Sequence, residues 1–348
     1  RHRATTAMML GDRIDTAQDV ATIAQAWSQL PLMARMLLDE QVDARVIAAV
    51  ISSEIAAITR RAAQFAEGKL AAEGLGGPPV PYSLLVLGSG GRGESLLAAD
   101  QDNAIIYAEG EPGGPEDRWF ERLGKETSSA LDAIGIHFCK GGIMASNAAW
   151  RMSRARWLAT VDRWVSRQRP EDLLNVDIFF DAISVHGEMR LAEEVIAKAY
   201  DAARRTPPFL VLLTENARGW SVPLSMFGKL KTDTGGRLDL KMHGLLPLVS
   251  GARLLAIKHG VRARSTPDRI AAVSAIGILD ADVAERLVES HRQIIGLILA
   301  QQLLDAEKGM SLSPKVALSQ QPVEVQKNLK EVLGAVETIR DLVLEGRF

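Results

Sequence analysis

The chain has 348 residues, of which 47% are hydrophobic and 24% charged, and 41 Lys and Arg against 43 Asp and Glu give a formal charge of −2. This balance excludes the broad basic surface of a protein that coats nucleic acid, and the single cysteine, Cys139, excludes an internal disulfide framework. No apolar stretch approaches the roughly 18 residues of a membrane span, so we expect a cytoplasmic protein without membrane contact.

The first part of the chain predicts helices. From Thr16 to about Glu73 the apolar residues recur at three- and four-residue spacing, which is typical of two or three amphipathic helices. Pro31 is expected to separate the first helix from the second. Glycines and prolines in 74–81 then stop helix formation, so a helical region is predicted over residues 1–75.

The middle of the chain, residues 76–205, mixes short apolar runs with amphipathic ones. Short apolar runs that end in glycine or polar residues predict buried strands, and the longer periodic runs predict helices. This pattern favours an α+β core with a small mixed sheet. The expected strands are 82–87, 103–108, 136–138 and 177–185, and the expected helices are 119–134, 148–160 and 161–167.

Beyond Pro207 and Pro208 the spacing is helical again through to the end of the chain. Breaks are expected at 235–236, at Pro267 and in 309–314, where glycine and proline interrupt the pattern. Residues 206–348 are therefore predicted to form a C-terminal helical domain.

A glycine-rich turn, Gly88-Ser89-Gly90-Gly91-Arg92-Gly93, directly follows the first predicted strand. Glycines permit positive backbone torsions and close approach, so that successive N–H groups can converge on a phosphate, with the Ser89 hydroxyl as a further donor. The sequence matches the dinucleotide-binding pattern literally, but only about six residues separate it from Asp100, which leaves no room for the long helix of that fold. No Gly-Lys-Ser or Gly-Lys-Thr is present, which excludes a Walker loop.

Two carboxylates follow the turn. Asp100 and Asp102 are two residues apart on an extended segment, so both point to the same face. Mg²⁺ prefers one or two carboxylates together with phosphate oxygens, and this combination predicts phosphoryl or nucleotidyl transfer.

These residues resemble a known family. A Gly-Ser turn followed by Asp-x-Asp is the signature of the DNA polymerase β-type nucleotidyltransferase superfamily. The string from Leu87 to Glu94 with Asp100 to Asn103 resembles a bacterial branch related to the PII-protein uridylyltransferase. The segment 139–150 resembles the middle of that family, and 238–247 resembles its C-terminal helical domain. The resemblance implies a polymerase β-type core flanked by helical domains, with CBS or cyclic-nucleotide-binding domains upstream in the full-length protein.

The resemblance also implies roles for individual residues. The phosphates of a nucleoside triphosphate (NTP) would be bound by the turn, and the metal, Mg²⁺ or Mn²⁺, by Asp100, Asp102 and a third carboxylate. Asp181 is the candidate for that third carboxylate, with Asp177 in reserve because both are expected on one strand face. The implied nucleotide-binding residues are Gly88, Ser89, Gly90 and Arg92, and the implied catalytic and metal-binding residues are Asp100, Asp102 and Asp181.

Three features leave alternatives open. Relatives carry an arginine two positions after the third carboxylate, where this chain has Ile183. Arg92 can contact phosphate or pair with Glu94 or Asp100. Residues 218–269 hold ten Lys and Arg but only three Asp and Glu. The basic residues form either a surface that attracts phosphate or a solvated helical face. The cations considered for the active-site mouth are Lys229, Lys231, Arg237 and Lys241.

The favoured hypothesis is a Mg²⁺-dependent enzyme that transfers a nucleoside monophosphate from an NTP to a hydroxyl, by resemblance one on a small regulatory protein. The alternatives are a nucleotide-sensing module without turnover and a transferase that acts on a small molecule or RNA. The sequence selects neither the NTP nor the acceptor.

Overall fold

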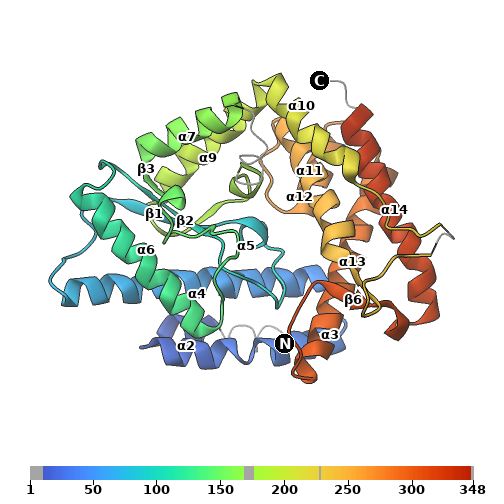
Figure 1. Ribbon diagram of the computed structural model, residues 1–348, viewed down its shortest axis with the longest axis horizontal. Helices are drawn as coiled ribbons and strands as arrows, with labels where there is room; N and C mark the ends of the chain where they lie inside the picture. Colours follow the sequence, from blue (N-terminus) through green and yellow to red (C-terminus); the bar gives the residue numbers. More distant parts are fainter. Residues whose placement is uncertain (1–10, 168–175, 227–228, 346–348) are drawn as a thin grey trace. The chain divides into compact units, whose positions relative to one another are not determined.

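The computed structural model describes residues 11–167, 176–226 and 229–345, which fall into two compact units. One unit comprises Val46–Ala199 together with the N-terminal helices up to Glu40, and the other comprises Tyr200–Phe348 with Gln41–Arg45. The sequence pattern groups residues 1–75 apart from the sheet, whereas in the structure these helices and the sheet share one unit. Figure 1 traces the elements of both units in chain order.

A four-stranded mixed sheet forms the centre of the first unit, in the order β3-β2-β1-β4. The strand β1 pairs antiparallel with both β2 and β4, and β2 pairs in parallel with β3. This small mixed sheet with its helices confirms the α+β fold class and is consistent with a nucleotidyltransferase-type core. The strands are β1 (Tyr82–Val86), β2 (Asn103–Tyr107), β3 (Arg151–Ser153) and β4 (Ile183–Gly187).

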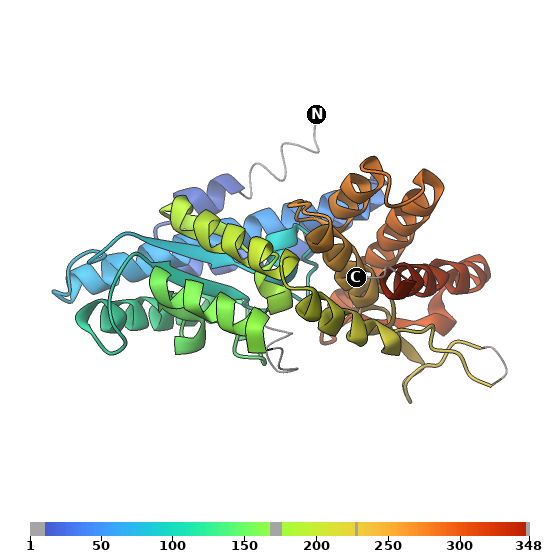
Figure 2. The same cartoon turned by 90° about the horizontal axis from the view of Figure 1, so that it is seen from above.

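Helices cover both faces of this sheet. α4 and α6 lie on one side and α7 on the other (Figures 1 and 2). Pro31 stands in the first turn of α3 and so separates it from α2, as expected. The helices are α2 (Val20–Trp27), α3 (Leu30–Asp39), α4 (Ala44–Ala72), α5 (Gly88–Arg92), α6 (Pro115–Ile134), α7 (Arg154–Arg167) and α9 (Met189–Arg204), with a 3-10 turn at Ala148–Trp150.

The core between the sheet and the α4 and α6 helices follows the alternation of the strands. Tyr82 and Leu84 of β1 lie beside Ile105 and Tyr107 of β2 on the face that packs against these helices. Phe120 of α6 stacks on the ring of Tyr107 with centroids 4.7 Å apart. The residues that alternate with these are buried as well, so that β1 and β2 are covered on both faces and lie at the centre of the core.

The expected strand over 177–185 is wrong in its first half. Val176 to Phe179 are helical and a turn follows, so that only Ile183–Gly187 is extended. Phe179 stacks on Trp157 with ring centroids 5.1 Å apart, and the turn also buries the neighbouring ring of Phe180, which an extended strand would place on the opposite face. Asp177 and Asp181 consequently do not share a strand face.

Two other expectations need correction. Residues 151–153, expected in a helix, form the edge strand β3, and the helix begins only at Arg154. Residues 136–138 form no strand. Among the described residues, their β-pairing consists of a single parallel bridge between His137 and Asp100. A turn at 139–142, closed by the Gly142 N–H to the Cys139 carbonyl, ends this pairing after one residue.

The second unit is helical, with a small sheet that the sequence pattern does not predict. α11 packs against α12 and α14, and α13 packs against the same two helices. The expected breaks fall before β5, at the start of α12 and between α13 and β6. Its elements are α10 (Pro207–Glu215), a 3-10 turn (Asn216–Gly219), β5 (Arg237–Asp239), a π-helical turn (Lys241–Leu245), α11 (Leu246–Lys258), α12 (Thr266–Ala275), α13 (Ala281–Glu307), β6 (Lys315–Ala317), a 3-10 turn (Leu318–Gln320) and α14 (Val323–Glu345). Throughout the described residues, no helix has the length and apolar character needed to cross a membrane.

An ion pair joins this small sheet to α13. Arg237 of β5 donates from both terminal nitrogens to Asp305, at 2.6 and 2.8 Å, and the Asp305 side chain is only 1% exposed. The hydrogen bonds from Arg237 hold the pKa of Asp305 below its usual range. Of the four cations considered for an active-site mouth, Arg237 is therefore paired inside its own unit.

Replacing Arg237 tests this ion pair. Arg237→Ala is expected to lower the free energy of unfolding by about 2–4 kcal/mol, because the buried Asp305 carboxylate loses its guanidinium partner. The pair Lys315–Asp233 serves as a control, since both side chains are more than a third exposed, and Lys315→Ala should cost less than about 1 kcal/mol. Urea denaturation of both variants measures the difference, and equal costs would contradict the structural role of Arg237.

A buried acid lies on α4 of the first unit. Glu54 is 6% exposed, and within the described part of the chain its Oε2 atom has no hydrogen-bond partner. Burial, together with the negative charge of Asp15, raises the pKa of Glu54 to about 7.

The stability of the fold should therefore depend on pH through Glu54. Protonated Glu54 stabilises the folded state below pH 4.5, the value for the unfolded chain, and this contribution is lost as the pH rises through about 7. Glu54→Gln should be more stable than the native chain at about pH 8 and should lose the decline between these two values. Urea denaturation across this pH range measures it, with Glu109→Gln on the surface as the control. A decline that persists in Glu54→Gln would contradict the assignment.

Candidate functional site

The glycine-rich turn follows β1 and forms the one-turn helix α5. Gly88 opens it with a φ of +55°, and Gly93 ends it in the left-handed region with a φ of +76°. At its start, the Leu87 N–H donates to the carbonyl of Asp102 at 2.9 Å. Positive φ values of this kind favour glycine, so the sequence folds into this turn because of where its glycines stand.

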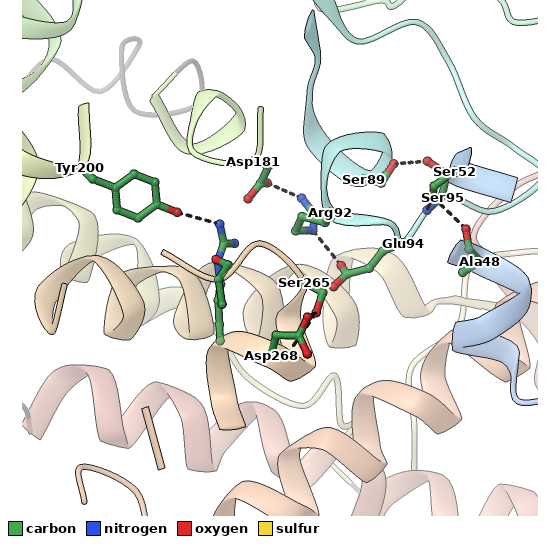
Figure 3. Close-up of polar contacts among 12 residues, drawn as sticks. Ala48, Ser52, Ser89, Arg92, Glu94, Ser95, Asp181, Tyr200, Ser265 and Asp268 are labelled. Carbon is green, nitrogen blue, oxygen red and sulfur yellow. Dashed lines mark hydrogen bonds and ion pairs between the residues drawn. The ribbon is translucent and has the colours of Figure 1, made fainter. Parts of the chain in front are cut away.

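A series of hydrogen bonds links the turn to α4 (Figure 3). The hydroxyls of Ser89 and Ser95 lie 3.1 Å apart, and the Ser95 N–H donates to the Ser52 hydroxyl at 2.9 Å. Ser52 in turn donates to the carbonyl of Ala48, one helical turn earlier in α4. The position of Ser89 therefore depends on a long helix outside the sheet, through residues that the motif did not point to.

The acidic segment 100–102 lies beside the turn. Asp100 is exposed, Gln101 is 2% exposed and Asp102 is half-buried, which is the alternation of an extended segment with its acids on the outer face. A small cavity is lined by Asp100 and Asp102 and also by Ser89 and Gly90 of the turn. The structure thus brings both carboxylates to one cavity with Ser89 and Gly90, whereas Gly88 and Arg92 of the predicted nucleotide-binding residues do not line it.

The contact between the turn and the acids is close. A Cβ atom at Gly88 would lie 2.9 Å from the Oδ2 atom of Asp102. A side chain at position 88 would therefore displace the carboxylate, so glycine is needed here both for its backbone torsion and for the space that it leaves.

Hydrogen bonds on both sides fix the acidic segment. The amide of Gln101 donates from Nε2 to the carbonyls of Ser128 and Ile136, both at 2.9 Å. Next to Asp102, the Asn103 side chain accepts from the Ala145 N–H at 2.8 Å. The motif did not point to Gln101 or to Asn103. For Gln101 a signal was present, because a polar residue between two acids that point outward must itself point inward, where it needs hydrogen-bond partners.

A thiol lies close to the two acids. Burial raises the pKa of Cys139, and the negative charges of Asp102 and Asp100 act in the same direction. The neutral thiol is therefore favoured beside the carboxylates, and it is a poor nucleophile in this form.

The third predicted carboxylate has a different partner. Asp181 is fully buried and accepts a hydrogen bond at its Oδ2 atom from the terminal nitrogen of Arg92, at 2.5 Å. The same guanidinium donates from Nε to Glu94 at 2.7 Å (Figure 3). Arg92 therefore pairs with Glu94, which is one of the alternatives that the sequence left open, and also with Asp181, which is not among them.

The backbone of Asp181 also touches the turn. A Cβ atom at Gly91 would lie 1.9 Å from the Asp181 carbonyl oxygen, a distance that no side chain tolerates. Gly91 therefore permits the approach that brings Asp181 to the end of α5, beside Arg92.

The fit of a divalent cation follows from these positions. Asp100 and Asp102 offer two accessible carboxylates at the cavity, which suits Mg²⁺ or Mn²⁺ with phosphate oxygens as the remaining ligands. Within the described residues, however, no three Asp, Glu, His or Cys side chains are grouped closely enough to hold a metal ion. Asp100 and Asp102 thus fit one cation, while Asp181 in this arrangement is bonded to Arg92.

Two segments of the chain match known protein families. Residues 28–171 match the family described as "Putative nucleotidyltransferase DUF294", and residues 207–345 match "Putative nucleotidyltransferase substrate binding domain". The chain belongs to this nucleotidyltransferase family. No curated protein matches the chain.

The two matches follow the division of the structure. The nucleotidyltransferase match contains the glycine-rich turn and the two acids of the cavity, and it ends before Asp181. The substrate-binding match covers α10 to α14 of the helical unit. The candidate site therefore lies in the sheet unit, which is one compact body.

The contact at Gly91 can be tested by adding one methyl group. Gly91→Ala should lower the free energy of unfolding by about 1–3 kcal/mol or more, because the new Cβ must displace the Asp181 carbonyl. Gly68→Ala is the matched control, since a Cβ at this helical position would meet no atom within 4 Å beyond its own stretch of helix, and it should be neutral or stabilise by up to about 1 kcal/mol. Urea denaturation distinguishes the two, and a neutral Gly91→Ala would refute the close approach.

Proposed function

We propose that the protein is a Mg²⁺-dependent nucleotidyltransferase that moves a nucleoside monophosphate from an NTP to a hydroxyl acceptor. One observation carries the proposal: Ser89 and Gly90 line the same small cavity as Asp100 and Asp102. Donors for phosphate and ligands for a divalent cation thus meet at one place in the nucleotidyltransferase-matched part of the chain.

The roles follow from the chemistry of the groups. The turn residues bind the phosphates of the NTP through backbone N–H groups and the Ser89 hydroxyl, and they leave the α-phosphorus accessible. Asp100 and Asp102 hold the cation, which stabilises the charge of the phosphates during displacement of pyrophosphate. The anchored Gln101 keeps both carboxylates in position while the acceptor oxygen approaches.

The acceptor is proposed to be a hydroxyl of a small regulatory protein, as in the PII-protein uridylyltransferase that the sequence resembles. The match of residues 207–345 to a substrate-binding domain supports an acceptor role for the helical unit.

A second candidate is a nucleotide-sensing module without turnover. The pairing of Asp181 with Arg92 favours it, because a carboxylate held by a guanidinium is not free to accept a proton from a substrate hydroxyl. Ile183, where the resemblance expects an arginine, is consistent with the same alternative.

Pyrophosphate release tests the enzymatic function. The protein is incubated with each of the four NTPs, Mg²⁺ and a cell lysate that supplies acceptors. The double variant Asp100→Asn/Asp102→Asn should lose at least about 100-fold of the release seen with the native chain, because it removes the cation ligands.

Glu121→Gln in α6 is the matched control, since it also neutralises an acid, one that pairs with Lys125 on the surface. It should retain full release. Equal release from the native chain and the double variant would exclude the proposed site. NTP binding without release from the native chain would favour the sensor.

A further inference from the structure

Basic side chains gather at one place in the helical unit, where the end of α9 lies beside the segment that joins α11 to α12. The two stretches, 200–205 and 258–269, hold six Lys and Arg but only two Asp and Glu, and both belong to the same compact unit. The contacts that join them are Arg262 with Asp201 at 3.3 Å, Arg269 with the Tyr200 hydroxyl at 3.2 Å, and Arg204, whose Cδ atom would lie 3.7 Å from a Cβ at Gly260. Cations from two distant parts of the sequence therefore form one cluster.

We call five of these cations, Arg204, Arg205, Lys258, Arg262 and Arg264, the basic patch. Arg204, Arg205 and Arg262 are exposed. Among the described residues, neither Arg204 nor Arg205 forms an ion pair. These two arginines are therefore accessible to a charged partner.

The two acids of these stretches are already engaged. Asp201 pairs with Arg262. Asp268 accepts a hydrogen bond from the Ser265 hydroxyl at 2.6 Å, and its own N–H donates back to that oxygen at the start of α12 (Figure 3). The two stretches consequently keep a net positive charge.

Neighbouring positive charges act against one another in this region. Burial lowers the pKa of His259, and the charge of Lys258 acts in the same direction. Burial likewise lowers the pKa of Arg264, again helped by a positive neighbour, Arg269. An acidic group bound here would be attracted by these cations and would offset their mutual repulsion.

The helix dipoles account for only part of the patch. Arg204 and Lys258 are the last residues of α9 and α11, where a cation complements the negative end of a helix. Arg262 and Arg264, by contrast, precede the start of α12, the positive end of that helix, where a cation gains nothing from the dipole. A partner with negative charge gives these two arginines a role that the fold itself does not.

We propose that the basic patch binds an acidic segment of the protein that receives the nucleotide. The inference rests on the proposed function and deepens it, because it names the chemistry by which the acceptor is recognised. Residues 258–269 lie within the part of the chain that matches a substrate-binding domain. Complementary charge speeds encounter and selects the partner.

A protein partner is favoured over a nucleic acid. The chain as a whole carries a formal charge of −2, and the patch is interrupted by Asp201 and Asp268. A row of phosphates needs an array of cations to neutralise it, and two acids inside the array would repel it. An acidic protein segment, whose charges are spaced irregularly, suits a mixed surface of this kind.

A fluorescein-labelled oligoglutamate peptide is the probe, with binding to the full chain measured by fluorescence anisotropy at low ionic strength. The native chain should bind it, and added NaCl should weaken the binding because exposed charges are screened. Arg204→Glu/Arg205→Glu should bind at least about 10-fold more weakly, because reversed charges face the peptide. Lys327→Glu/Lys330→Glu, which reverses two exposed cations of α14, is the matched control and should stay within about twofold of the native chain.

Three outcomes would overturn the inference: no binding of oligoglutamate, an equal loss in the two double variants, or tighter binding of a single-stranded oligonucleotide of the same charge to the same arginines. If Arg204→Glu/Arg205→Glu fails to fold, Arg205→Glu is compared with Lys330→Glu. It should weaken peptide binding by about threefold or more, and an effect no larger than that of Lys330→Glu would also overturn the inference.

Competition links the patch to the acceptor. With lysate acceptors and excess Mg²⁺, unlabelled oligoglutamate should reduce pyrophosphate release by the native chain severalfold, whereas oligolysine should not. If the native chain releases no pyrophosphate from any NTP, the proposed function fails and the acceptor role of the patch fails with it. If release is intact but insensitive to oligoglutamate, the proposed function stands and the patch alone fails.

Discussion

The approach of two backbones at Gly91 is the constraint on which the candidate site depends. The carbonyl of Asp181 lies where a side chain at position 91 would begin. This approach fixes the start of β4 against the end of β1, where Val86 pairs with Ile183. On the other side of β1, Val86 pairs with Asn103, so that Asp102 and Asp181 directly precede the two strands that flank β1. The missing side chain at Gly91 thus sets how near Asp181 comes to the turn, as the one at Gly88 does for Asp102.

The remaining contacts of the site are hydrogen bonds that reach out from the turn into the rest of the sheet unit. Ser89 is connected to α4 by hydrogen bonds through Ser95 and Ser52. The acidic segment is held by Gln101, which donates to the carbonyl of Ser128 in α6 and to that of Ile136 just after α6. Because each bond satisfies a buried polar group, loss of one partner leaves another group unpaired. The site is therefore part of the core of the unit and cannot shift without disturbing it.

Much of this arrangement could be predicted from the sequence. The fold class, the strands at 82–86 and 103–107 and the family follow from apolar runs next to a glycine-rich turn and an Asp-x-Asp pair, which are local patterns. The sequence predicts 177–182 wrongly as part of a strand because its two phenylalanines suit a strand as well as a helical turn, and only packing on Trp157 decides between the two structures. The pairing of Arg92 with Glu94 is among the alternatives that the sequence offers, but its second partner, Asp181, is not, because the two residues are 89 positions apart and no local pattern connects them. Whether Asp100, Asp102 and Asp181 act together stays a prediction.

The anchoring of Gln101 has a consequence for the energetics of the two acids on either side of it. Asp100 and Asp102 carry like charges on one face, and a free segment would relieve their repulsion by turning one of them away. Two hydrogen bonds from the buried amide prevent this rotation. Both carboxylates are therefore kept on the same outer face. A cation that bound there would meet ligands whose backbone is already fixed by the core, so that little ordering of the segment would oppose its binding.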